Sequence, residues 1–342
     1  MTPYDVIVIG SGPAGCSAAV TCVKNGLDVL MVTDATDRQH DAPDSMADAL
    51  ESIHPGVSSL LKKIGIAGAE VPAIRASYSG IYAGDNYTPL GEDEEGVWQG
   101  MHIDRSVFDH QLLHQAGDAG VKMIVNEKVE NFIAENNKVT GISTSTRDLF
   151  GGYIIDATGK KGLAGRKLNF KRKYYSPPLL CSTGMSGCSE TFPLDRHAAH
   201  FIAAGKGWTW LAPHPPEYCA WTRLSMSGDK STAPPNELHA YPVFGKIKFA
   251  NMRWRLFRPL CTEGLLLCGD AAGILDPAAG QGIFNALLSG KIAAEAIVTC
   301  LQEPAYASFH LARYDHWFVD QFELKVQQLR QYYQDHGIHI FH

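Results

Sequence analysis

The sequence lacks the features that would assign it at once to several common classes. Its eight cysteines include no CxxC pair and no histidine at zinc-type spacing, which argues against a structural metal site. No apolar run approaches about 18 uninterrupted residues, and an apolar segment begins within a few residues of Met1, which leaves no room for a signal peptide. The net charge of -6 comes with no basic run of the kind that binds nucleic acid.

These absences predict a cytoplasmic protein with reduced thiols, no bound metal, no nucleic-acid partner and no transmembrane segment. A redox pair of Cys181 with Cys188 stays open as the less favoured alternative to buried thiols. With 342 residues the chain exceeds the usual length of one domain, so we expect two closely packed domains.

The first clear motif is a glycine-rich turn between an apolar strand and a helix of small residues. In VIVIGSGPAGCSAA, residues 6–19, Gly10, Gly12 and Gly15 stand in GxGxxG register. The first glycine permits a sharp turn, the second lets a pyrophosphate approach the backbone, and the third lets helix pack on strand. A second strand, LDVLMV, leads to Asp34, 24 positions after Gly10, where an acid can bind ribose hydroxyls. The segment predicts a dinucleotide site.

The rest of the chain alternates between segments that predict β-sheet and segments that predict a strand followed by a helix. Residues 128–157 read as a β-meander that ends in a strand before Thr158 and Gly159, and residues 167–250 read as an antiparallel sheet. Residues 265–283 return to a buried strand, a Gly-Asp turn and a helix of small residues. An amphipathic aromatic helix follows at 305–336, where an aromatic stripe of this kind is most often core packing.

Three motifs in this order resemble one large group of FAD enzymes. They are the N-terminal GxGxxG, DATG at 156–159, and LLLCGDAAGILDPAAGQGI at 265–283. The group contains p-hydroxybenzoate hydroxylase-type monooxygenases, flavin-dependent tryptophan halogenases and geranylgeranyl reductases. The resemblance covers most of the chain and implies an α/β fold, α+β overall. Its parts are a Rossmann-like FAD-binding domain of the glutathione-reductase type, an inserted antiparallel β-sheet substrate domain and a C-terminal helix.

The resemblance implies the domain limits and the residues that hold FAD. The FAD-binding domain is predicted at 1–75, 98–166 and 251–300, the substrate domain at 76–97 and 167–250, and a C-terminal helical segment at 301–342. Arg105 matches a residue that approaches the FAD phosphates, Val129 one against the adenine, and Asp270 can accept from the ribityl hydroxyls. The predicted cofactor-binding set is Gly10, Gly12, Pro13, Ala14, Gly15, Asp34, Arg105, Val129, Thr158, Gly159, Gly269, Asp270, Gly280, Gly282 and Ile283.

The turn from Pro277 to Gly282, with Gly280 and Gln281 within it, is predicted to face the flavin, where a helix N-terminus favours the charge of the reduced ring. The substrate pocket is predicted near five further residues, each with a structural alternative: Glu51, His54, Ser79, Trp208 and Trp210. Glu51 and His54 are read more readily as a helix-cap glutamate and a structural histidine than as proton carriers. Trp208 and Trp210 share one face of a strand, and equally suit packing against the flavin domain.

Within the group, the lysine that halogenases hold in the pocket is replaced here by Ser79, which argues against halogenation. The strings ESIHPGVSSLLKKIGI, DATGKKGLAGRKL and QYYQ look most similar to a halogenase-like branch of maturation flavoproteins for quinone-cofactor oxidases. That similarity predicts a monooxygenase acting on an electron-rich aromatic substrate, either a small molecule or a Trp or Tyr side chain of a protein precursor.

Other functions remain open from the sequence alone. The main alternative is a geranylgeranyl-reductase-like enzyme that reduces C=C bonds, although the chain is short for one that wraps a long isoprenoid. An NAD dehydrogenase and a flavin-binding protein without turnover are less favoured. Because no second GxGxxG is present, electrons must come from transiently bound NAD(P)H or from a flavin reductase.

Overall fold

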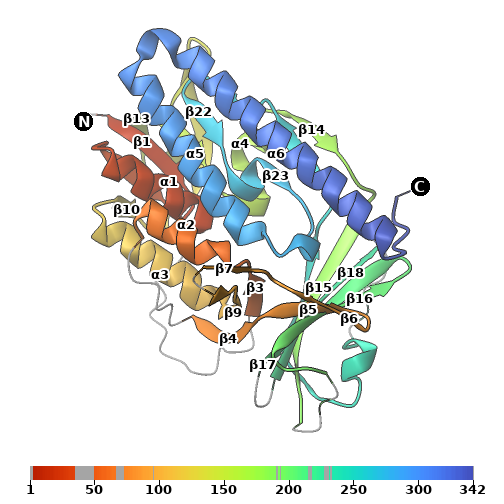
Figure 1. The fold of residues 1–342 in the computed structure, drawn as a ribbon. Coiled ribbons are helices and arrows are strands. Elements are labelled where there is room, and N and C mark those ends of the chain that lie inside the picture. Colours follow the sequence, from red (N-terminus) through yellow and green to blue (C-terminus); the bar gives the residue numbers. More distant parts are fainter. Residues whose placement is uncertain are drawn as a thin grey trace.

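The computed structural model describes residues 3–34, 50–66, 73–94, 96–189, 192, 194–214, 218–226, 231 and 233–341 (Figure 1). Parts of the predicted FAD-binding ranges, at 35–49 and 67–72, therefore lie outside the described residues. The side chain of Ala279 is also outside them.

A mixed sheet forms the centre of the N-terminal part. Its strands run in the order β10-β2-β1-β13-β12-β11, and β22 and β21 extend it beside β13. The pairs β10–β2, β2–β1, β1–β13 and β13–β22 are parallel, which explains why β1 and β2 are nearly continuous apolar runs. The strands are β1 (Tyr4–Ile9), β2 (Val29–Val32), β10 (Lys122–Ile124), β11 (Val129–Glu135), β12 (Lys138–Thr144), β13 (Asp148–Asp156), β21 (Cys261–Thr262) and β22 (Leu265–Leu267). The predicted Rossmann-like arrangement and β-meander are confirmed.

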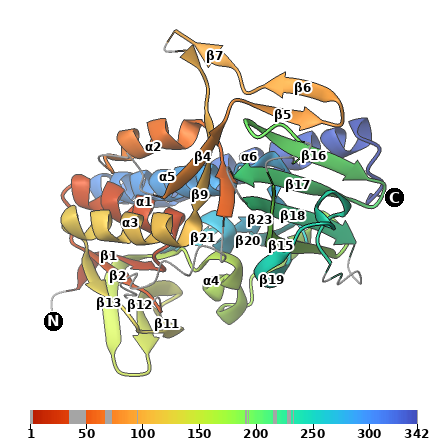
Figure 2. The same cartoon turned by 90° about the horizontal axis from the view of Figure 1, so that it is seen from below.

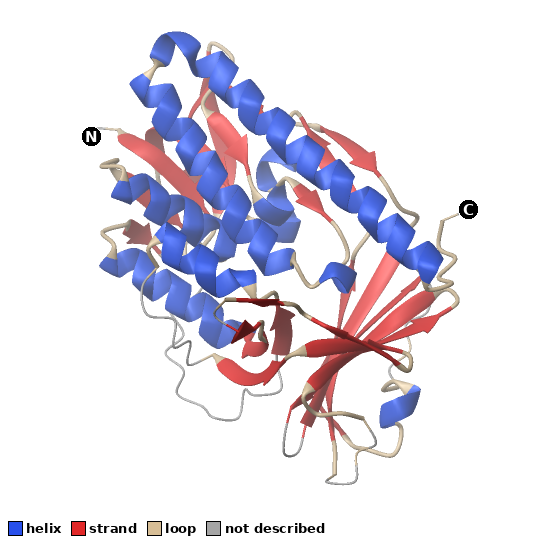
Figure 3. Cartoon of the chain, in the orientation of Figure 1, coloured by secondary structure: helices blue, strands red, loops and turns tan. Residues whose placement is uncertain are grey.

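Helices cover one face of this sheet, with α1 and α5 side by side and α6 running alongside α5 toward the C-terminus (Figure 1). α1 begins after Gly12 with Pro13 in its first turn, and α2 ends at Gly65 in the left-handed conformation. The helices are α1 (Pro13–Lys24), α2 (Gly56–Ile64), α3 (Arg105–Asp118), α4 (Leu163–Lys167), α5 (Gly282–Gln302) and α6 (Ala307–Asp335) (Figure 3).

A second sheet lies beside the helical layer (Figure 2). Its strand order is β19-β15-β18-β17-β16-β5-β6. The prediction of a wholly antiparallel sheet is wrong at one pair, since β16 and β5 run parallel: β5 comes from a distant part of the chain and reaches the sheet by a crossover. The strands are β5 (Gly80–Ala83), β6 (Asn86–Pro89), β15 (Leu179–Gly187), β16 (Ala198–Ala204), β17 (Gly207–His214), β18 (Tyr218–Met226) and β19 (Val243–Asn251).

Smaller sheets join the two parts. One has the order β3-β9-β4, another β14-β20-β23, and β7 pairs with β8. Residues 76–78 and 171–174, which the predicted limits assign to the substrate domain, thus pair outside the seven-stranded sheet; the division into domains itself stays a prediction. The strands are β3 (Leu50–Ile53), β4 (Ile74–Tyr78), β7 (Glu92–Asp93), β8 (Gly96–Val97), β9 (Gly100–Asp104), β14 (Lys171–Tyr174), β20 (Arg255–Arg258) and β23 (Gly273–Ile274).

The alternative of a Cys181–Cys188 redox pair is wrong. Cys181 lies within the extended strand β15 and Cys188 directly after its end, so seven residues at about 3.3 Å each separate them along the chain. A disulfide needs Cα atoms within about 7 Å. Cys181 belongs to the main core and Cys188 to a separate apolar cluster, and neither sulfur is in a disulfide among the described residues.

α5 is long and apolar enough, by length and composition, to cross a membrane. Half of its most apolar window is buried inside the fold, where α5 packs on α1 and α6. Core helices of globular proteins share this composition, so the helix gives only weak evidence for a membrane span.

Three chain segments meet at backbone distance around α1. A Cβ atom added to Gly290 of α5 would lie 2.1 Å from the carbonyl oxygen of Ala14, and one added to Gly15 would lie 2.0 Å from that of Gly10. A Cβ on Gly10 would meet the carbonyl oxygen of Ala157 at 2.6 Å. The third glycine of the GxGxxG motif therefore serves close packing, as predicted.

The contact between α1 and α5 makes a stability prediction. Gly290→Ala forces the two helices apart, so we expect the free energy of unfolding to fall by at least about 2 kcal/mol. Gly117→Ala in α3 is the matched control, because its nearest neighbour would be a flexible methionine methyl at 3.5 Å. That control should gain up to about 1 kcal/mol from helix propensity. Urea unfolding measures both, and an equal response of the two variants would contradict the packing described.

Candidate functional site

Two glycines of the predicted cofactor site have no structural reason to be glycine. A Cβ atom at Gly12 or Gly282 would meet no atom within 4 Å, and neither residue has a positive φ. Gly12 precedes the first turn of α1, and Gly282 begins α5. Open space before two helix N-termini is what a bound phosphate or flavin ring requires. The chain around this space thus fits FAD.

Asp270 follows β22 in the one-turn helix η4 (Gly269–Ala271). Its carboxylate makes no hydrogen bond to any described residue, although burial raises its pKa. The charges of Lys160 and Arg105 lower the pKa in part. A partly buried carboxylate without a protein donor suits hydroxyl groups of a ligand, in line with the predicted ribityl contact.

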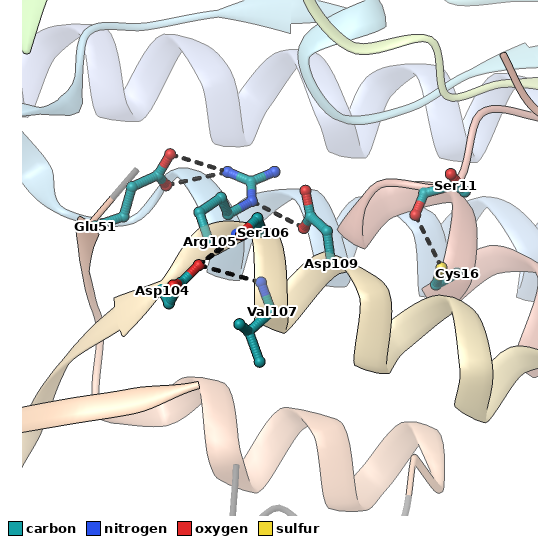
Figure 4. A network of polar contacts seen from close by, with 8 residues as sticks. All are labelled: Ser11, Cys16, Glu51, Asp104, Arg105, Ser106, Val107 and Asp109. Atoms are coloured by element: carbon teal, nitrogen blue, oxygen red, sulfur yellow. Dashed lines mark hydrogen bonds and ion pairs between the residues drawn. The ribbon is translucent and has the colours of Figure 1, made fainter. Parts of the chain in front are cut away.

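Arg105 lies between two carboxylates at the start of α3 (Figure 4). Its Nη1 donates to both oxygens of Glu51, at 3.0 and 3.2 Å, and its Nε donates to Asp109 at 2.8 Å. Burial opposes the charge of Arg105, but Glu51 and Asp109 outweigh it and raise its pKa. Burial raises the pKa of Cys16 in α1, and the charge of Asp109 raises it further. Arg105 is therefore held in place and charged at the start of α3, a helix that packs on α1.

The Glu51 prediction needs a correction. Glu51 lies on β3 and pairs with Arg105 of α3, so it is not a helix cap. The cap of α3 is Asp104, whose Oδ1 accepts from the backbone of Ser106 and Val107 at 3.0 and 3.2 Å (Figure 4). The sequence shows Glu51, Asp104 and Asp109, but it does not show which of these acids pair with Arg105 and which one caps α3.

Other predicted cofactor residues form the walls of the same region. Asp34 pairs with Lys161 at the surface. The hydroxyl of Thr158 donates to the buried Asp156 at 2.6 Å and accepts from Leu163 at 3.0 Å, so it fixes the turn around Gly159. Val129, Pro13, Ala14, Gly269 and Ile283 are buried. Their contacts with a cofactor stay predictions.

The turn predicted to face the flavin is ordered by a carboxylate that sequence reasoning missed. Asp276 Oδ1 accepts from the backbone of Ala278 at 3.0 Å and so caps the one-turn helix η5 (Pro277–Ala279). Its Oδ2 accepts from Trp254 Nε1 at 2.6 Å and from Tyr333 Oη at 2.7 Å. Only the local Asp-Pro pattern of a turn was visible in the sequence; Trp254 and Tyr333 come from distant segments.

This arrangement extends into the seven-stranded sheet. Trp208 Nε1 donates to Tyr333 Oη at 2.7 Å, and Trp208 is 1% exposed. Asp276, Tyr333 and Trp208 therefore link the turn, α6 and β17 in one buried hydrogen-bonded chain. After Asp276, Gly280 takes the left-handed conformation and Gln281 caps α5 through its backbone position, without a side-chain bond.

The remaining pocket residues make structural contacts. Trp210 Nε1 donates to Ser52 Oγ of β3 at 2.9 Å, so both tryptophans join the second sheet to the rest of the molecule. His54 Nδ1 accepts from the backbone of Gly56 at 3.0 Å, and burial lowers its pKa. Ser79 and Tyr87 share a hydrogen bond of 3.2 Å. No metal-binding group of three or more His, Cys, Asp or Glu side chains occurs among the described residues.

Half of the chain matches a known protein family. Residues 5–176 match the family described as "Glucose inhibited division protein A". This range contains β1, the glycine-rich turn, Arg105 and the DATG strand end. Of the second sheet, the matched range contains β5 and β6 and ends before β15.

Relatives and solved structures match over nearly the full length. A digeranylgeranylglycerophospholipid reductase of Methanosphaerula palustris is 28% identical over 92% of this chain and 81% of its own. One of Methanocella arvoryzae is 27% identical over 91% and 82%. A geranylgeranyl bacteriochlorophyll reductase-like protein from Thermoplasma acidophilum has a TM-score of 0.80 at 22% identity, covering 98% of this chain and 88% of that one. The flavin-dependent brominase Bmp2 has a TM-score of 0.80 at 20% identity, covering 96% and 87%. The predicted mixed fold with a Rossmann-like FAD-binding domain is confirmed.

The open glycines make a binding prediction. Gly12→Val fills space that the fold does not use, so FAD should be lost while the unfolding midpoint of the apoprotein changes little. Asp270→Ala should also weaken FAD binding, because it removes a hydrogen-bond acceptor. Visible absorbance after purification and thermal unfolding of FAD-free protein measure the two effects. A protein that keeps its full yellow colour after both changes contradicts the site.

Asp276 makes a prediction about pH. Burial raises its pKa to about 6, against the lowering effect of its hydrogen-bond donors. A raised folded-state pKa stabilises the fold below about pH 4, and this contribution is lost as pH rises through about 6. The free energy of unfolding of the unchanged protein, relative to Asp276→Asn, should therefore fall by about 2 kcal/mol between pH 4 and pH 7. A difference between the two proteins that does not vary with pH contradicts this assignment.

Proposed function

We propose that this chain, which belongs to the glucose inhibited division protein A family, is an FAD-dependent oxidoreductase that reduces C=C bonds of prenyl groups. The finer part of the proposal rests on one observation. Relatives named digeranylgeranylglycerophospholipid reductase align with 92% and 91% of the chain, thus through both the flavin motifs and the second sheet. The substrate class proposed is a geranylgeranyl-bearing glycerophospholipid.

This proposal replaces the preference drawn from the sequence. The short chain argued against a prenyl reductase, but 92% of this chain aligns with 81% of the first relative. Aromatic hydroxylation has no comparable support and is not confirmed, and the closeness to maturation flavoproteins of quinone-cofactor oxidases stays a prediction. For halogenation, the resemblance puts Ser79 at the position of the pocket lysine, and the Ser79 hydroxyl shares a hydrogen bond with Tyr87.

The chain's own residues suit this chemistry. Reduced FAD, when bound, supplies the hydride for one alkene carbon, while a proton must reach the other carbon. Arg105 and the N-terminus of α1 would hold the phosphates, and Asp270 the ribityl hydroxyls. The N-terminus of α5 at Gly282 favours negative charge at the flavin. Asp276, through Ala278, Trp254 and Tyr333, keeps the turn before α5 in place.

A turnover experiment tests the proposal. FAD-loaded protein, kept reduced with dithionite under nitrogen, is incubated with a geranylgeranyl-bearing glycerophospholipid. We expect products heavier by two hydrogens for each double bond reduced, detected by mass spectrometry, and no such products with Gly12→Val. Unchanged lipid would contradict the proposal. Addition of one oxygen to an aromatic compound in air would instead support hydroxylation.

A further inference from the structure

The paired strands β14 and β20 carry basic side chains on both faces, but, in the described part of the chain, only the basic side chains on one face have carboxylate partners. The strands pair with Lys171 opposite Arg258 and Tyr174 opposite Arg255. On the face toward α6, Lys173 Nζ lies 2.9 Å from Glu323 and Arg258 Nη2 lies 2.8 Å from Asp315. Lys173 and Arg258 on this face are therefore paired with carboxylates of α6, which lies beside β14 (Figure 1).

The opposite face carries arginines without such partners. Arg172 and Tyr174 alternate with Lys173 along β14, so they lie on this face together with Arg255. Arg172 Nη1 donates to Tyr174 Oη at 3.2 Å, and the guanidinium of Arg253 lies 3.8 Å from the centre of the Tyr174 ring. Among the described residues, no carboxylate lies within ion-pair distance of Arg172, Arg253 or Arg255.

Gathering these cations costs free energy, which aromatic rings and backbone carbonyl oxygens offset only in part. Burial lowers the pKa of Arg255, and the charge of Arg172 lowers it further. The Nε atom of Arg255 is buried without a hydrogen-bond partner. The hydrogen bond from Arg172 lowers the pKa of Tyr174, and nearby arginine charges add to this effect. An anion from outside the chain would interact favourably with each of these arginine charges.

The position of this face connects it with the proposed reaction. Arg255 Nη2 donates to the carbonyl oxygen of Lys160 at 2.7 Å, directly after Gly159 of the predicted FAD site. The charge of Asp270 raises the pKa of Arg255 in part, against the effect of burial. Tyr174 is 43% exposed. The face is therefore open to solvent and adjacent to the segments that fit FAD.

We propose that Arg172, Arg253 and Arg255, with Tyr174, form a binding site for a phosphate group carried by a small-molecule reactant of the proposed reduction. Guanidinium groups bind phosphate through paired N–H donors, and no second glycine-rich turn competes for this role. Two reactants carry such a phosphate: NADPH as electron donor, and the lipid through its headgroup. The identity of the ligand rests on the proposed function, whereas the phosphate site itself does not.

Calorimetric titration of the FAD-loaded protein at low ionic strength tests the site. The first probe is inorganic pyrophosphate. Arg172→Gln and Arg253→Gln should each weaken its binding at least tenfold, because each removes a charged donor from the site. Lys171→Gln is the matched control: it removes the same charge from the same strand on the opposite face, and binding should change less than twofold.

Two further pairs of probes identify the source of the phosphate. NADPH is compared with NADH, and a short-chain phosphatidate with the diacylglycerol of the same chains. A preference for the phosphorylated member that is lost in Arg172→Gln and Arg253→Gln supports the proposal and names the reactant. The proposal is overturned if pyrophosphate does not bind, if Lys171→Gln weakens binding equally, or if neither pair is discriminated. These titrations need no turnover, so their outcome is independent of whether prenyl lipids are reduced.

Discussion

The fold depends on backbone-to-backbone packing around Ala14. Gly290 brings α5 against the carbonyl of Ala14, Gly15 brings α1 against Gly10, and Gly10 brings the turn against Ala157. No side chain fits at these points, so residues far apart in sequence are held at fixed mutual distances. The same packing leaves open space at Gly12 and Gly282, which the protein does not fill. The predicted cofactor site is thus the gap between these close contacts.

The second sheet is joined to this gap by polar groups inside a mostly apolar core. Asp276 collects donors from the turn before α5, from Trp254 and from Tyr333 of α6, and Tyr333 accepts from Trp208. A buried carboxylate with several donors fixes geometry more sharply than apolar contact does. The orientation of the second sheet, where a substrate would lie, is therefore coupled to the turn beside the proposed flavin.

The features that could be predicted from the sequence are those that depend on residues close together in the chain. The glycine-rich turn, the DATG strand end, the meander and the Gly-Asp turn each follow from neighbouring residues, and the fold class followed from their order. Pairings between distant segments were not predictable: Glu51 with Arg105, Asp34 with Lys161, β16 with β5, and Asp276 with Trp254 and Tyr333. Each depends on which elements meet in the fold, and periodicity carries no information about that.

The most direct test of the proposed function is a single-turnover experiment. FAD-loaded protein is reduced to completion under nitrogen and mixed with a geranylgeranyl-bearing glycerophospholipid while the flavin absorbance is recorded. Our account predicts that the absorbance of oxidised flavin returns without oxygen, in step with the loss of one double bond per flavin. A flavin that stays reduced until oxygen is admitted would contradict it.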